Sequence, residues 1–193
     1  MVKKTKKSSR MALYMTLFMV FIMVTSLAGF LAPDEGSDFK YGKYKFTARE
    51  DAFYTSIDGK QFRFYHTPEL AENVTFDTAA KDKIFGSRMI LVSFEPSEDP
   101  VFDLVRFELS QEMPELFSVF VASGIALEDD RYDLPVISCL NATEYVPVIM
   151  LLPSNESSVT IDDDCIAISG SEDGLLLAKD RLMYSLAGIL DGE

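Results

Sequence analysis

The longest hydrophobic pattern in the chain is an uncharged run near its start. Residues 11–31 contain no charged side chain, and residues 1–10 before them carry five Lys and Arg. As a helix, these 21 residues extend about 31 Å, close to the hydrocarbon thickness of a bilayer. Because a flank rich in Lys and Arg stays on the cytoplasmic side, the pattern predicts a cytoplasmic basic tail at 1–10, a transmembrane signal anchor at 11–31 and an exported remainder.

A cleavable signal peptide is the alternative interpretation of the same segment. Ser26 and Ala28 place small residues at the two positions that signal peptidase reads. The apolar run is longer than the usual signal core of about 7 to 15 residues, which favours the uncleaved anchor. A buried core helix is disfavoured, because a helix that is apolar on every face needs a large protein around it. Both favoured interpretations export the remainder of the chain.

Aromatic and polar positions alternate after a short acidic tether at residues 32–38. In residues 39–48 this alternation shifts its phase at Gly42, which is typical of a strand with a bulge. Two further strand-like runs are joined by Asp58 and Gly59, a pair suited to the positive φ angles of a type I′ turn. The domain is therefore expected to open with an antiparallel β-ribbon.

The rest of the domain, which is expected to run from residue 39 to residue 193, mixes helical and strand-like patterns. Helices are predicted over residues 76–86 with Asp77 as cap, over 101–123 with a break at Pro114, and over 171–190. Strands are predicted over residues 88–94, 134–139, 146–152 and 165–170. This order predicts an α/β fold, with α+β as the alternative, in which helices cover a mixed sheet.

Charge is distributed unevenly along the chain. The whole sequence of 193 residues has 18 Lys and Arg against 31 Asp and Glu, a net charge of −13. Five basic residues precede the apolar run and every acidic residue follows it, so the exported part has 13 basic and 31 acidic residues, or −18. Such a surface repels nucleic acid, and a DNA- or RNA-binding role is therefore disfavoured.

All three asparagines of the chain begin an Asn-x-Ser/Thr sequon. Asn73 stands in "NVT", Asn141 in "NAT" and Asn155 in "NES". The set predicts N-glycosylation of an exported protein. The alternative is that these residues serve local turns, which the sequence around Asn155 resembles.

Cys139 and Cys165 are the only cysteines. An even count in an oxidising compartment predicts a disulfide between them. Two buried, reduced thiols that pack as small apolar groups are the alternative. A catalytic thiolate is disfavoured, because no basic residue lies nearby in the sequence to lower the pKa of the thiol.

Motifs that carry chemistry are few. His66 is the only histidine, so any histidine-dependent catalytic or zinc site must include it, and its position predicts a plain surface or turn residue. No nucleotide-binding or hydrolase motif occurs, and no cofactor is predicted. The acidic clusters at 97–99, 128–130 and 162–164 are interpreted as solvated caps and turns, with weak divalent binding as the alternative. No catalytic, cofactor-binding or metal-binding residue is therefore assigned.

Three stretches carry a resemblance to a known group of proteins: "SFEP", "VISCLNATEYVPVIMLL" and "CIAISGSEDGLLLAKDRLMYSLAGI". Together with the basic start and the single apolar run, they resemble short, uncharacterised single-pass envelope proteins of archaea over residues 40–190. The resemblance implies an extracytoplasmic location, which suits the acidic surface and the sequons. It implies no catalytic residue.

These observations favour a membrane-anchored extracytoplasmic binding or assembly module of the cell envelope. The aromatic ribbon at residues 39–65, or an open sheet edge, is expected to meet a protein or glycan partner at the cell surface. An envelope enzyme based on a carboxylate pair or on Cys139 is the first alternative. An accessory subunit of a membrane complex is the second.

Overall fold

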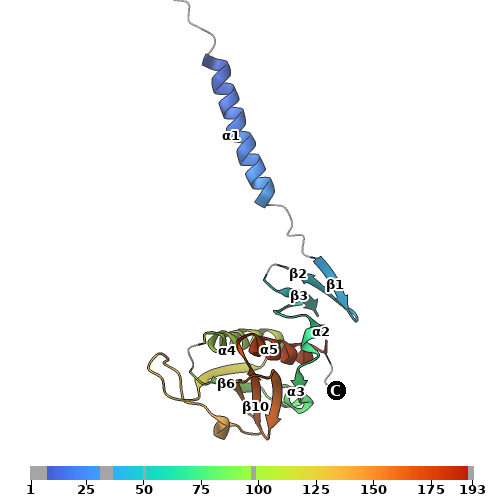
Figure 1. Cartoon of the computed structure of the whole chain (residues 1–193), viewed down its shortest axis with the longest axis vertical. Helices are drawn as coiled ribbons and strands as arrows, with labels where there is room; N and C mark the ends of the chain where they lie inside the picture. Colours follow the sequence, from blue (N-terminus) through green and yellow to red (C-terminus); the bar gives the residue numbers. More distant parts are fainter. Residues whose placement is uncertain (1–7, 31–36, 50, 97–98, 191–193) are drawn as a thin grey trace, which may run out of the picture. The chain divides into compact units, whose positions relative to one another are not determined.

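The computed structural model describes residues 8–30, 37–49, 51–96 and 99–190 (Figure 1). The chain divides into two compact units, Met1–Gly36 and Ser37–Glu193. Most of the predicted basic tail and tether, residues 1–7 and 31–36, lies outside the described residues.

The first unit contains one helix, α1, which runs from Ser8 to Phe30. Its described side chains, at residues 11–25, are all exposed. Within the part of the chain that the structure describes, no helix combines the length and the apolar character that a membrane crossing needs. The span at residues 11–31 therefore stays a prediction.

The second unit opens with a four-stranded antiparallel sheet in the order β1-β2-β3-β4. Its strands are β1 (Ser37–Tyr41), β2 (Tyr44–Ala48), β3 (Phe53–Ile57) and β4 (Lys60–Phe64). The predicted turn between β3 and β4 is confirmed, since Asp58 and Gly59 have φ angles of 51° and 79°. The predicted bulge at Gly42 is wrong: Gly42 has a φ of 55° and turns the chain from β1 into β2.

A six-stranded mixed sheet forms the second layer of strands, in the order β5-β9-β10-β8-β6-β7. Its strands are β5 (Thr75–Phe76), β6 (Met89–Phe94), β7 (Phe120–Ile125), β8 (Val148–Pro153), β9 (Ser158–Asp162) and β10 (Cys165–Gly170). The four strands β10, β8, β6 and β7 are parallel, while β9 runs antiparallel to β10. The prediction of a mixed α/β fold with an antiparallel ribbon and a mixed sheet is confirmed.

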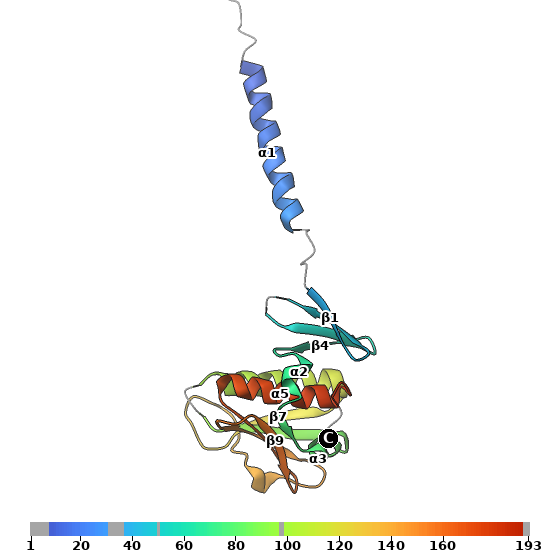
Figure 2. The ribbon, with the colours of Figure 1, turned by 45° about the vertical axis from the view of Figure 1, so that its right-hand side comes forward.

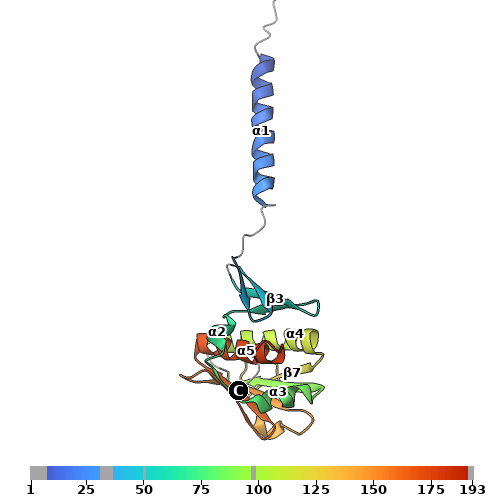
Figure 3. The same cartoon turned by 90° about the vertical axis from the view of Figure 1, so that its right-hand side faces the viewer.

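The two longest helices of this unit lie between the two sheets. The unit contains α2 (Pro68–Ala71), α3 (Thr78–Phe85), α4 (Val101–Glu112), a π-helical turn at Met113–Phe117, a 3-10 turn at Cys139–Asn141 and α5 (Glu172–Leu186). In all three views, α4 and α5 lie with the four-stranded sheet on one side and the six-stranded sheet on the other (Figures 1, 2 and 3). Both sheets therefore bury one face on the same helical layer.

Aromatic residues of the β-ribbon enter this shared core. Phe46 and Phe64 are fully buried, and the ring of Phe64 stacks on that of Tyr184 in α5 at a centroid distance of 3.8 Å. On the other side, α5 buries its predicted apolar face, which includes Leu175, against the six-stranded sheet. The ribbon is therefore part of the core of the domain.

Two predicted elements differ from the structure. Residues 134–139 form no strand, because only Val136 makes an isolated bridge there and the chain then enters the 3-10 turn. The predicted helix at residues 101–123 ends as α4 at Glu112, followed by the π-helical turn around Pro114 and by β7. The predicted break at Pro114 is confirmed, because Pro cannot donate the next backbone hydrogen bond, but Phe120–Ile125 form a strand where helix was predicted.

Candidate functional site

A cluster of ionised side chains is buried between the four-stranded sheet and the helices. Lys179 of α5 is 0% exposed, and its Nζ lies 3.0 Å from Glu108 Oε2 and 3.1 Å from Glu112 Oε2 of α4. Tyr65, just beyond β4, donates its hydroxyl hydrogen to Glu108 Oε1. Arg63 of β4 lies 3.5 Å from the same carboxylate oxygen. The cluster joins three elements that are distant in the sequence.

Burial and mutual attraction set the charges in this cluster. Burial raises the pKa of Glu112, although the Lys179 ammonium acts against the rise. Burial also favours a lower pKa for Lys179, but the carboxylates of Glu112, Asp180 and Glu108 outweigh it and raise that pKa. A lysine held protonated is no nucleophile, and no surface hollow described here includes it. The cluster is therefore a structural tie between layers.

His66 lies in the bend after β4, as the turn interpretation predicted, but it is not a plain surface residue. Its side chain is 12% exposed, and its Nδ1 lies 3.0 Å from Oδ2 of the buried Asp180. The same oxygen accepts hydrogen bonds from the backbone N–H groups of Tyr65 and His66, each at 2.8 Å. Tyr184 donates a hydrogen bond of 2.6 Å to the carbonyl oxygen of His66. These bonds fix the end of β4 to α5.

An Asp–His pair of this kind resembles two members of a catalytic triad, but a nucleophile is not in place. Nε2 of His66 faces Asp173 Oδ1 at 3.8 Å. Among the described residues, no serine or cysteine forms a hydrogen bond to His66. The pair lacks the geometry of a hydrolase and instead joins elements of the fold.

A crevice of about 440 Å³ lies at the carboxyl ends of β8 and β10. Open α/β sheets often bind ligands at this position. Its wall includes Asp99, Phe102, Asn155, Ser171 and Glu172. No histidine, lysine or cysteine is among the described residues that line it.

The second hollow, of about 660 Å³, lies on the four-stranded sheet where β2 and β3 separate. Their pairing covers Phe46–Ala48 and Phe53–Thr55 and then stops, and Thr55 Oγ1 donates to the carbonyl oxygen of Lys45 at 2.9 Å. The lining side chains are the cations Lys43, Lys45 and Arg49, the aromatic Tyr44 and Tyr54, and the polar Thr47, Thr55, Ser56 and Gln61, with Gly59. We call this site the β2–β3 hollow.

The lining of the β2–β3 hollow contains no carboxylate among the described residues. Lys45 is paired with Asp38 at 2.7 Å. Lys43 and Arg49 instead lie over aromatic rings, 5.1 Å from the centroid of Tyr44 and 4.7 Å from that of Tyr54. The hollow therefore presents positive charge and hydrogen-bonding groups on a chain whose net charge is −13.

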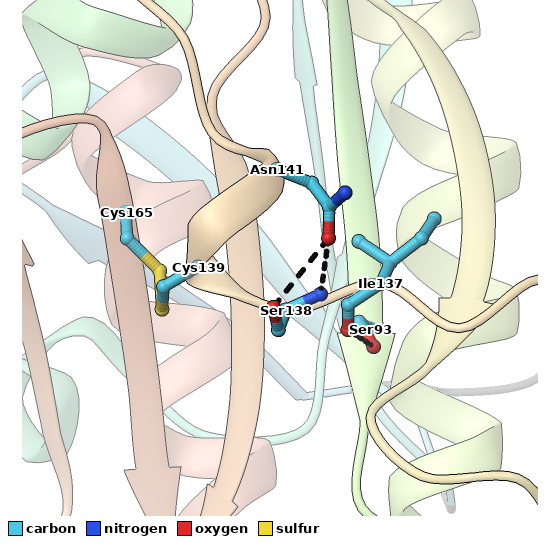
Figure 4. Close-up of a disulfide and its surroundings, with 6 residues drawn as sticks. All are labelled: Ser93, Ile137, Ser138, Cys139, Asn141 and Cys165. Carbon is cyan, nitrogen blue, oxygen red and sulfur yellow. Dashed lines mark hydrogen bonds between the residues drawn. A yellow bond between two sulfur atoms is a disulfide. The ribbon is translucent and has the colours of Figure 1, made fainter.

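The predicted disulfide between Cys139 and Cys165 is present, with an S–S distance of 2.05 Å (Figure 4). It ties the 3-10 turn to the first residue of β10. Next to it, Asn141 Oδ1 accepts a hydrogen bond from the backbone N–H of Ser138 at 2.9 Å. A sulfur held in a disulfide is not a thiolate, so this geometry gives no support to a reaction based on Cys139.

The three sequon asparagines, Asn73, Asn141 and Asn155, are all exposed. Asn73 donates from Nδ2 to the carbonyl oxygen of Glu69 at 2.9 Å. Asn141 uses only its Oδ1 in the bonds with Ser138. Their glycosylation stays a prediction.

Within the described residues, no group of three His, Cys, Asp or Glu side chains could hold a metal ion. Asp99 accepts from the backbone N–H of Val101 at 2.9 Å, the capping role predicted for it. Asp129 binds Arg131, which lowers its pKa to about 2. Ser97 and Glu98, the other members of the first cluster, lie outside the described residues.

Comparisons with protein-family models, with curated proteins and with solved structures found no match to the chain.

The ribbon at residues 39–65 was predicted as a binding region, but neither the β2–β3 hollow within it nor the buried cluster was predicted from the sequence. A signal for the cluster existed, since Lys179 falls in the apolar stripe of α5, four residues after Leu175 and three before Leu182. A signal for the hollow existed too. Residues 37–65 carry six basic and four acidic residues, while residues 66–193 carry seven basic and 25 acidic residues.

Proposed function

We propose that the chain is a membrane-anchored extracytoplasmic binding module of the cell envelope, whose binding face is the outer face of the four-stranded sheet. The anchor is the apolar segment at residues 11–31, with the basic tail at 1–10 in the cytoplasm. The disulfide is consistent with an exported domain, since disulfides persist in oxidising compartments. The exposed sequons are compatible with the same location.

The observation that carries the proposal is the β2–β3 hollow. A concave surface with clustered cations and no lining carboxylate is unusual on a strongly acidic chain, and it selects for an anionic partner. The opposite face of the sheet is fixed to α5 by Phe64, Tyr65 and His66. The hollow therefore sits on a rigid support, as a binding site requires.

Geometry gives less support to the enzyme alternative. The carboxylate with a raised pKa, Glu112, lies in the buried cluster and lines neither the crevice at β8 and β10 nor the β2–β3 hollow. The crevice beside β8 and β10 carries no paired base and nucleophile among its described lining residues. A binding role is therefore the better supported function.

Retention on a cation exchanger tests the binding face. The full chain, purified in a nonionic detergent at pH 7, is applied to a sulfopropyl resin at low salt. We expect retention despite the net charge of −13, and earlier elution for the double variant Lys43→Gln/Arg49→Gln. The matched control is Lys40→Gln/Arg88→Gln, which removes the same charge from exposed residues outside the hollow.

The control decides between the hollow and the basic tail, which also carries positive charge. Equal elution of the two double variants would overturn the proposed binding face.

The location is tested separately with a C-terminal tag on the chain in intact cells. We expect external protease to remove the tag, and a protected tag would contradict the proposed orientation.

A further inference from the structure

We infer that the ligand of the β2–β3 hollow is an acidic saccharide, a carboxylated or sulfated sugar unit of an envelope glycan. The inference rests on the proposed function, because it names the ligand class of the same face. Three features of the hollow carry it: its cations, its tyrosines and its uncharged polar groups.

The cations are arranged to meet an anion. Lys43 and Arg49 have no ion-pair partner among the described residues, and each is placed over a tyrosine ring. Cation–π contact holds these side chains in position without neutralising them. The N–H groups of the Arg49 guanidinium can therefore donate to a carboxylate or a sulfate group of a ligand.

Tyrosine and uncharged polar side chains distinguish a sugar from a bare anion. Tyr44 and Tyr54 supply aromatic surface, while their hydroxyl groups donate to the carbonyl oxygen of Gly188 and to Asp51 Oδ2. Thr47, Ser56 and Gln61 supply hydroxyl and amide groups. A sugar ring has apolar C–H faces and a rim of hydroxyl groups, so it uses both kinds of contact. An inorganic anion has no apolar face to place on an aromatic ring.

The shape of the hollow favours a saccharide over an acidic peptide. Strand addition of a peptide needs an open strand edge, but the unpaired ends of β2 and β3 here face each other across the hollow. Thr55 Oγ1 already bonds to the carbonyl oxygen of Lys45 within this gap. A volume of about 660 Å³ accepts a short oligosaccharide without opening the sheet.

The ion pair with Asp38 fixes the position of the Lys45 side chain at the wall of the hollow. Asp38 accepts from Lys45 at 2.7 Å and from Thr47 Oγ1 at 2.8 Å, and these bonds lower the pKa of its carboxyl group. Asp38 therefore stays ionised and holds Lys45 at the wall. Net attraction for an acidic ligand comes from Lys43 and Arg49.

Calorimetric titration of the full chain in detergent micelles tests the inference. The probes are trigalacturonate as acidic saccharide, maltotriose as neutral saccharide and hexa-aspartate as acidic peptide. We expect trigalacturonate to bind at least tenfold more tightly than either control probe. We expect Arg49→Gln to weaken it about tenfold, and Tyr54→Leu, which removes both aromatic surface and the ring beneath Arg49, to weaken it by a larger factor than it weakens hexa-aspartate binding.

The matched control variant is Lys40→Gln, which removes one positive charge from the same sheet outside the hollow and is expected to change affinity less than twofold. Near-ultraviolet circular dichroism confirms that each variant is folded. Equal affinity for hexa-aspartate and trigalacturonate would overturn the saccharide inference but leave the proposed binding face intact. Binding of trigalacturonate that Arg49→Gln does not weaken would overturn the inference as well.

Discussion

At the scale of single residues, local hydrogen bonds were predicted from the sequence and contacts between distant residues were not. The caps at Asp77 and Asp99 and the turn at Asp58 were predicted correctly, because each depends on bonds within a few residues. The partners of Lys179 were not predicted, because Glu108 precedes it by 71 residues and no local pattern joins them. The role of His66 was missed for the same reason, since Asp180 follows it by 114 residues.

Replacing Lys179 is the sharpest test of the buried cluster. In Lys179→Met, the carboxylates of Glu108 and Glu112 lose their buried cation, and we expect a loss of about 3 to 5 kcal/mol in the free energy of unfolding. Urea unfolding measures it. The control Lys45→Met breaks an exposed ion pair with Asp38 and is expected to lose at most about 1 kcal/mol.

A variant that also removes the carboxylates left without a cation shows whether the loss of stability comes from the ion pairs or from packing. The triple variant Lys179→Met/Glu108→Gln/Glu112→Gln leaves no unpaired carboxylate from α4 in the cluster, so we expect it to recover most of the lost stability. A triple variant no more stable than Lys179→Met would show that the loss comes from packing of the lysine stem.

The raised pKa of Tyr65 predicts how the free energy of unfolding changes at alkaline pH. Burial and the hydrogen bond to Glu108 raise the pKa of its phenol to about 12. The unfolded chain therefore loses this proton first, near pH 10, so the contribution to stability is complete below about pH 10 and is lost as the pH rises toward 12. Urea unfolding midpoints measured from pH 9 to 12 should fall less steeply in Tyr65→Phe. Equal slopes would contradict the assignment.

At the scale of elements, the sequence predicted the types of most segments and few of their pairings. The strands at β6, β8 and β10 and the helices at α3 and α5 have strong periodicity, and all are present. The edge strand β5 and its neighbour β9 were not predicted, and the two residues of β5 carry too little pattern to separate a strand from a loop. Strand order depends on contacts between distant segments and was not predicted either.

The disulfide is the element-scale feature with the clearest test. Cys139 and Cys165 are 26 residues apart, and a closed loop of that length stabilises a fold by about 3 to 4 kcal/mol in the chain-entropy model. We expect Cys139→Ser/Cys165→Ser to lose about that amount in urea unfolding. Addition of dithiothreitol should lower the stability of the wild type and leave the double variant unchanged. A reductant effect of equal size in both proteins would show that it does not act through this disulfide.

For the whole molecule, the core explains which part of the chain should fold independently. In the part of the chain that the structure describes, the large core cluster and the residues packed against it begin at Phe39. A chain that starts at Ser37 should therefore keep the disulfide and the urea midpoint of the full chain, measured under identical detergent conditions. A markedly lower midpoint would show that the first unit contributes to stability.

The position of α5 between the two sheets also limits the order of folding. The backbone N–H of Tyr65 bonds to Asp180, which is made 115 residues later. While the polypeptide is still being synthesised, the aromatic rings of the first sheet have no helix to cover them. Nascent chains must therefore remain incompletely folded, and accessible to chaperones, until the residues of α5 have emerged from the ribosome.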